Sequence, residues 1–172
     1  MMRLILTSLV LVGLSGCSTY AVQRYSVKAD NVVAYRDNNK KYNVGQFTST
    51  EANLKQIICR GVGPIKTPDD QTFAEYIAGA VTDELKMAGA YDSKSDKKLT
   101  GNLDLVQFDS MDGSWSLTLT LVSANGTPVQ KQEKYKYTTS YYGETACNQT
   151  AQAFMPAVQN LLGQFANDTK LK

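Results

Sequence analysis

The sequence predicts an α+β fold with two layers, in which an antiparallel sheet of three to five strands carries two amphipathic helices on one face. Apolar and polar residues alternate over 114–121, which is the period of a strand with one buried face. Two other segments space their apolar residues three and four positions apart, as helices packed on a core do. The turn sequences Asp112-Gly113 and Asn125-Gly126 separate consecutive strands, which predicts a meander.

The first two strands are expected to be short. Residues 32–35 and 44–48 are rich in β-branched and aromatic side chains, and the turn-forming residues 36–39 separate them. From 51 to 60 the apolar residues fit either a helix or a buried strand. The Gly- and Pro-containing segment 61–68 is expected to be a loop.

A helix is expected to begin at Thr72. Thr72 and Glu75 match the S/T-x-x-E capping box, in which each side chain bonds to a backbone amide at the start of the helix. Apolar residues then recur at helical steps as far as Ala88, and Gly89 suits the left-handed position after a helix. A second helical pattern follows the last strand and contains Pro156, which predicts a kink or two abutting helices.

The meander strands are expected over 99–108, 115–121 and 129–141, with a bulge where the first changes phase. An odd-length first turn would pair Leu103 with Leu119.

The same register would pair Leu105 with Leu117. It would also turn Lys131 and Glu133 toward the apolar side, so that end of the third strand is expected at an edge of the sheet. The opposite face of the sheet is expected to be open, either as a solvated surface or as a surface for a glycan or protein partner. Its hydroxyl, amide and ammonium side chains are Ser114, Ser116, Thr118, Thr120, Gln130, Gln132, Lys134 and Lys136.

The composition argues against several classes of chemistry. The chain has no histidine, which removes Ser-His-Asp and Cys-His catalysis and histidine-ligated zinc. Asp109, Ser110 and Asp112 form too short a run for a calcium loop of the EF-hand kind. A formal net charge of +2 is too small for a nucleic-acid footprint. No cofactor, metal ion or nucleic acid is therefore expected.

The residues Leu14-Ser15-Gly16-Cys17 resemble the lipobox of bacterial lipoprotein precursors, because small residues precede the cysteine directly after a short apolar run. The resemblance implies a signal peptide at 1–16, a lipidated Cys17 with a tether over 17–25, and one globular domain over 26–172. Several acyl chains would hold the protein firmly to a membrane. Ser18, where some lipoproteins have Asp, suggests the outer membrane, with the body facing the periplasm.

The layout of elements also resembles envelope accessory lipoproteins, such as those of lipopolysaccharide transport and those that activate penicillin-binding proteins. The segments ICRGVGPI at 58–65, YIAGAVTDEL at 76–85 and SANG at 123–126 are similar to an uncharacterised family of small outer-membrane lipoproteins. Once Cys17 is lipidated, Cys59 and Cys147 remain as a pair in an oxidising compartment, which predicts a disulfide; two free buried thiols are the alternative.

These observations favour a non-enzymatic outer-membrane lipoprotein that binds or steadies another envelope component, either a protein or a glycan. Arg60, Tyr141 and Tyr142 are the candidate partner-binding residues, while Tyr135 and Tyr137 are expected to pack in the core.

Two other functions compete with this hypothesis. A peptidoglycan or glycan hydrolase would use a carboxylate pair, either Asp109 with Asp112 in a turn or Asp83 with Glu84 on the polar side of the first helix. A surface-exposed adhesin is the third possibility.

Overall fold

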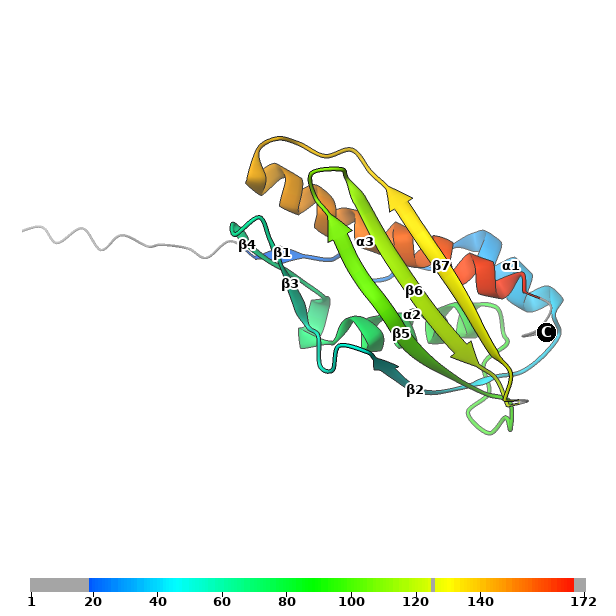
Figure 1. Ribbon diagram of the computed structural model, residues 1–172. Helices are drawn as coiled ribbons and strands as arrows, with labels where there is room; N and C mark the ends of the chain where they lie inside the picture. Colours follow the sequence, from blue (N-terminus) through cyan, green and yellow to red (C-terminus); the bar gives the residue numbers. More distant parts are fainter. Residues whose placement is uncertain (1–18, 125, 169–172) are drawn as a thin grey trace, which may run out of the picture.

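The computed structural model describes residues 19–124 and 126–168 as an α+β fold with three α-helices and two mixed sheets (Figure 1). The predicted signal peptide and Cys17 lie outside the described residues. In chain order the elements are β1 (Tyr20–Ala21), α1 (Ala29–Asp37), β2 (Asn43–Ser49), β3 (Gln56–Cys59), β4 (Gly63–Lys66), the short 3₁₀ turn Pro68–Asp70, α2 (Phe73–Met87), β5 (Lys98–Asp109), β6 (Ser114–Val122), β7 (Pro128–Lys136) and α3 (Gly143–Ala166).

The main sheet has the strand order β2-β5-β6-β7, and its three long strands form the expected antiparallel meander. Leu103 pairs with Leu119 as predicted, and Tyr135 pairs with Trp115. The expectation of a purely antiparallel sheet is wrong, because β2 lies parallel to β5. A parallel neighbour requires a crossover connection, and here that connection contains the hairpin β3–β4 and helix α2.

A bulge in β5 shifts the register after Leu103. The expectation of an odd-length turn is wrong, because the β5–β6 turn has four residues, 110–113. Leu105 therefore lies opposite Thr118, not opposite Leu117 as expected, and Val106 takes the place beside Leu117. The extra residue in the bulge, Asp104, then restores the pairing of Leu103 with Leu119. The extra residue turns Leu105 away from the helices, where it is partly exposed.

Helices α2 and α3 both lie behind the main sheet in Figure 1 and cover one of its faces. Trp115 of β6 packs against both helices. Its ring centroid lies 4.8 Å from that of Phe154 in α3 and 6.3 Å from that of Phe73 in α2. Its indole N–H donates to the Thr150 carbonyl at 2.8 Å, which satisfies the one polar atom of a fully buried side chain. α3 is one helix through Pro156, not two abutting helices.

The start of α2 has the expected capping box. The Glu75 amide donates to the Thr72 hydroxyl at 3.1 Å, and the Thr72 amide donates to the Glu75 carboxylate at 2.7 Å. Gly89 follows the helix with a positive φ of 67°.

A second, three-stranded sheet has the order β1-β4-β3 and corrects two expectations. The ambiguous segment 51–60 contains a strand, and the expected loop 61–68 contains its hairpin partner β4. The expected tether 17–25 is partly folded, because Tyr20–Ala21 pairs with β4 and the side chains of Tyr20 and Val22 are buried.

The expected strand at 32–35 is wrong, since these residues belong to α1. Asn31, Val32 and Tyr35 are buried while Val33 is exposed, so a helical spacing and not strand alternation decides which side chains face the core. The amide of Asn31 donates to the Glu84 carboxylate of α2 at 2.8 Å and fixes α1 against that helix.

β7 ends at Lys136, not at 141. It is an edge strand, as expected for its inward polar residues. Lys131 forms an ion pair with Asp168 at 2.5 Å, and Glu133 accepts a hydrogen bond from Gln164 of α3 at 2.8 Å. These contacts satisfy charged groups that would otherwise face the apolar layer.

Candidate functional site

Cys59 and Cys147 form the predicted disulfide, with an S–S distance of 2.07 Å and α-carbons 5.8 Å apart. Cys59 ends β3 and Cys147 lies in the first turns of α3, and both side chains are fully buried. The alternative of two free buried thiols is therefore wrong. The bond ties the small sheet to the start of α3.

Arg60 holds two loops at the same end of the molecule. Its backbone has a positive φ of 49° and that of Gly61 has 68°, which makes the tight turn between β3 and β4. The guanidinium Nε donates to the Ser110 hydroxyl at 2.9 Å and Nη2 donates to the Ser110 carbonyl at 2.6 Å. Nη1 donates to the Tyr141 carbonyl at 3.1 Å. Because all three nitrogens bind acceptors of the protein itself, this geometry gives Arg60 a positioning role.

The side chains of Tyr141 and Tyr142 both point into solvent and are 95% and 80% exposed. Their loop is nevertheless fixed, because Arg60 binds the Tyr141 carbonyl and the Thr139 hydroxyl donates to the Ser110 carbonyl at 2.6 Å. Tyr137 differs from them, since its half-buried hydroxyl lies 2.7 Å from that of Thr150. A fixed loop backbone thus exposes two aromatic rings with polar tips to solvent.

Three further apolar side chains are exposed on the segments that Arg60 and Ser110 join to the tyrosine loop. Met111 follows Ser110 in the β5–β6 turn, and Ile58 and Val62 flank the β3–β4 turn. A Cβ built on Gly143 would lie 2.8 Å from the Val62 side chain, which places that turn against the start of α3. We call this surface the apolar end, and it consists of Ile58, Val62, Met111, Tyr141 and Tyr142.

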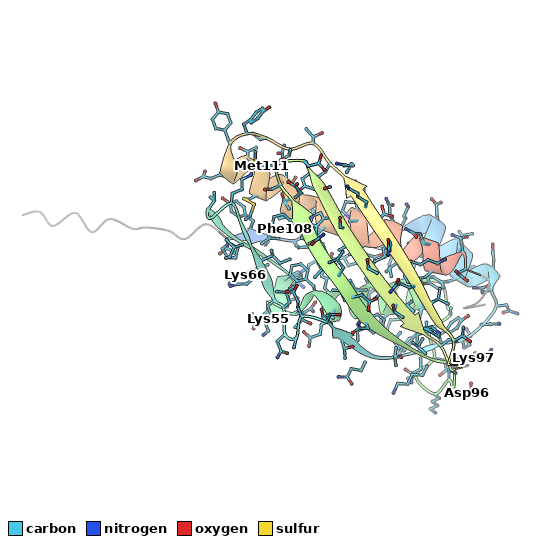
Figure 2. All side chains as sticks on the ribbon, viewed as in Figure 1. Lys55, Lys66, Asp96, Lys97, Phe108 and Met111 are labelled. Atoms are coloured by element: carbon cyan, nitrogen blue, oxygen red, sulfur yellow. A yellow bond between two sulfur atoms is a disulfide. The ribbon has the colours of Figure 1, made fainter. Side chains whose placement is uncertain are left out.

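The turns that carry the apolar end meet where β1 begins (Figure 1), and Met111 marks this end in Figure 2. Sequence reasoning singled out the two tyrosines but missed Ile58, Val62 and Met111. Val62 and Met111 are single apolar residues in turns, and Ile58 lies in the apolar run of β3, so no local pattern shows that these side chains are exposed together. Only the tertiary fold brings the turns together.

The open face of the main sheet has the predicted register. Four cross-strand pairs place the expected polar side chains of β6 and β7 on one surface; they are Ser114 with Lys136, Ser116 with Lys134, Thr118 with Gln132, and Thr120 with Gln130. The view in Figure 1 is onto the face that α2 and α3 leave uncovered. Ser114 and Thr118 are nonetheless buried among their neighbours, so the longer side chains of β7 supply most of the accessible surface.

Asp104 organises one part of this face. Its carboxylate accepts hydrogen bonds from Asn102 at 2.6 Å, Thr120 at 2.6 Å and Gln130 at 3.2 Å. Thr48 of β2 extends the row by donating to the Asn102 amide oxygen at 2.8 Å. A continuous polar ladder therefore crosses all four strands. The sequence did not reveal Asp104 as a member, because Asp104 is the extra residue of the bulge, and the bulge could not be placed to a residue from the sequence.

An open hollow of about 500 Å³ lies between this ladder and the β5–β6 turn. The polar side chains that line it include those of Gln107, Asp109, Ser114, Ser116 and Lys134. Carboxylate, hydroxyl, amide and ammonium groups thus converge on one concave area, which suits a ligand rich in hydroxyl or amide groups.

In the first carboxylate pair considered for hydrolysis, both members have structural partners. Asp109 accepts from the backbone amides of Met111 at 2.8 Å and Asp112 at 3.0 Å, which stabilises the turn. Asp112 forms an ion pair with Lys136, and this pairing lowers the pKa of its carboxyl group.

The second pair contradicts its expected placement on the polar side of α2, because Asp83 is exposed but Glu84 is fully buried. Burial raises the pKa of Glu84, although Tyr25 and Asn31 donate hydrogen bonds to its carboxyl group.

Comparison with protein-family models and with curated proteins returns no match to this chain. Within residues 19–124 and 126–168, no helix combines the length and the apolar character that crossing a bilayer requires. The same residues contain no group of three or more His, Cys, Asp or Glu side chains that could hold a metal ion.

Proposed function

We propose that this protein is a lipid-anchored, non-enzymatic component of the bacterial envelope that binds another envelope molecule through the open face of its main sheet. The observation that carries the binding role is the polar face of β5, β6 and β7, which both packed helices leave uncovered and which contains the hollow beside Lys134. Its hydroxyl, amide and ammonium groups suit a glycan or the polar surface of a partner protein.

The anchoring role is supported by the lipobox residues Leu14-Ser15-Gly16-Cys17 and by the use of the other two cysteines. Cys59 and Cys147 form a disulfide, as proteins of oxidising compartments such as the periplasm do. Cys17 is then the one cysteine left for lipid attachment. Ser18 supports sorting to the outer membrane in this proposal.

The anchor can be tested with Cys17→Ala in the bacterial host. We expect the unsubstituted protein to fractionate with the outer membrane and to carry acyl chains on Cys17 in mass spectra of its N-terminal peptide. The variant should keep its unprocessed signal peptide or leave the outer membrane, while its body still forms the Cys59–Cys147 disulfide. An unlipidated, correctly folded wild-type protein in the soluble fraction would refute the anchor.

The binding role can be tested with a photo-crosslinking amino acid introduced at Gln132, an exposed position on the open face. In intact cells it should give a discrete adduct, whereas the same group at Asp83, which is exposed on α2, should not. Equal labelling from both positions, together with no envelope defect on deletion, would refute the proposal. Release of fragments from purified sacculi, lost in Asp109→Asn, would show an enzyme instead.

Orientation can be tested by protease treatment of whole cells. A periplasm-facing body is protected until the outer membrane is opened, whereas a surface adhesin is cleaved at once.

A further inference from the structure

We infer that the apolar end rests on the surface of the membrane that holds the lipid anchor, with its tyrosines at the lipid–water interface. The inference depends on the proposed lipidation of Cys17. It assigns a lipid surface, formed by headgroups and the first carbons of the acyl chains, to side chains that the fold exposes at one end.

The first argument is the concentration of exposed apolar side chains. The large hydrophobic side chains exposed among the described residues number eight, and five of them form the apolar end. The other three, Val33, Met87 and Leu105, lie on three different elements. Scattered apolar side chains are ordinary on a protein surface, but a gathered set marks an interaction site.

The second argument is where the anchor must be. Tyr20 lies beside Ile65 in parallel register, so the chain enters β1 from the side of the β3–β4 turn, which carries Val62. Cys17 precedes Thr19, the first described residue, by two positions. An extended chain spans at most about 3.6 Å per residue, so the α-carbon of Cys17 lies within about 7 Å of Thr19. A lipid on Cys17 therefore holds this end of the body close to the bilayer.

The third argument is the chemistry of the end itself. Tyrosine is enriched at membrane–water interfaces, because its ring enters the apolar layer while its hydroxyl stays hydrated. The loop 137–143 contains no charged residue, and the only charged residue in 57–63 is Arg60, whose guanidinium is engaged inside the protein. Asp109 and Asp112 flank Met111, and Glu144 follows Gly143. Asp109 accepts from the backbone amides of its own turn and Asp112 is paired with Lys136, so contact through the apolar side chains desolvates few unpaired charges.

The arrangement also fixes an orientation. The long strands run away from the apolar end, and β5 alone, at about 3.3 Å per residue, extends roughly 36 Å from Asp109 to Lys98. Asp96 and Lys97 lie at the opposite end from Met111 in Figure 2. With the apolar end on the lipid, the long strands point away from the bilayer surface. The open face of the sheet then remains in the aqueous compartment, where a partner can reach it.

The test uses the lipidated protein in vesicles of phosphatidylethanolamine and phosphatidylglycerol, with or without bromine on the acyl chains, which quenches nearby tryptophan. Tyr142→Trp places a reporter at the apolar end, and Lys97→Trp places a matched reporter at the opposite end. The buried Trp115 gives both variants the same background. We expect brominated lipid to reduce the emission of Tyr142→Trp and to leave Lys97→Trp and the unsubstituted protein unchanged.

A charge at the apolar end should weaken the contact. In the Tyr142→Trp background, Met111→Glu should reduce quenching, because a carboxylate resists leaving water. Met87→Glu replaces a similarly exposed methionine at the end of α2 and should leave quenching unchanged.

Mass spectrometry and vesicle flotation separate the possible failures. Protein without acyl chains on Cys17 would overturn both the anchor and this inference. Lipidated, vesicle-bound protein in which Tyr142→Trp is not quenched, or is quenched no more than Lys97→Trp, would overturn the inference alone. In that case, a photo-crosslink from Tyr141 to a protein in cells would assign the apolar end to a partner protein.

Discussion

Removing the disulfide should destabilise the body strongly. The bond joins residues 88 positions apart, and the chain-entropy relation for a loop of that length gives about 4.6 kcal/mol of stabilisation through restriction of the unfolded chain. We therefore expect Cys59→Ser with Cys147→Ser to lower the free energy of unfolding by about 3–5 kcal/mol. At about 2–4 °C per kcal/mol for a chain of this size, the melting temperature should fall by roughly 6–20 °C.

Denaturant unfolding followed by tryptophan fluorescence measures this loss. Trp115 is the single tryptophan and is fully buried, so its emission reports on the contact between the main sheet and α3. Reductant should bring the wild type close to the double variant and leave the double variant unchanged. A loss below about 1 kcal/mol, far under the calculated value, would refute the reasoning.

Three other predictions concern stability. Folding raises the pKa of Glu84 above its ordinary value of about 4.3, so the wild type should lose stability relative to Glu84→Gln as pH rises from about 4 to 8. Urea unfolding at several pH values should show that the difference in unfolding free energy between the two proteins changes with pH in this direction, and a pH-independent difference would contradict the prediction. Thr72→Ala breaks the capping box and should cost about 1 kcal/mol in thermal or urea unfolding, whereas no change would assign the cap no energetic role. Gly101→Ala places a Cβ 2.5 Å from the Phe47 ring and should destabilise the protein by about 1–3 kcal/mol. Gly79→Ala, which has open space around it in α2, should instead stabilise the protein by about 0.5–1 kcal/mol, and equal effects of the two variants would show that the close approach to Phe47 does not matter.

The elements that the sequence predicted well are those whose signals are local. Alternation over 114–121 predicted which side chains of β6 face the core, and the pair Thr72 and Glu75 predicted the start of α2. In each case neighbouring residues contain the whole signal, so no distant contact is needed to interpret it.

The elements that were missed depend on distant partners. Residues 32–35 have strand-like side chains, yet they form a helix that Asn31 fixes to Glu84, 53 positions away. The parallel pairing of β2 with β5 and of β1 with β4 leaves no turn signal between the paired strands. Tertiary contacts override a weak local preference in these segments.

The residues of the candidate site also divide into those with a local sequence signal and those that depend on distant partners. The polar residues of β6 and β7 were predictable from alternation, whereas Asp104 required the position of a bulge. Arg60 was selected from its place beside Cys59, but its role depends on Ser110, 50 positions later. A side chain's donors can be counted from the sequence, but their acceptors cannot be identified until the loops are placed.

The positions of the disulfide and of the Arg60 hydrogen bonds bear on how the body could be held at a membrane. The disulfide and the hydrogen bonds of Arg60 fix the turns that carry the apolar end. Gly113 adds a constraint, because its φ is +65° and a Cβ there would lie 2.2 Å from the Tyr137 carbonyl. Exposed apolar side chains gain little from packing within the protein, so their loops need other restraints to keep one shape. The disulfide and Arg60 thus restrain the loops that would meet the lipid, whereas the hydrogen bonds of Asp104 organise the open face of the sheet.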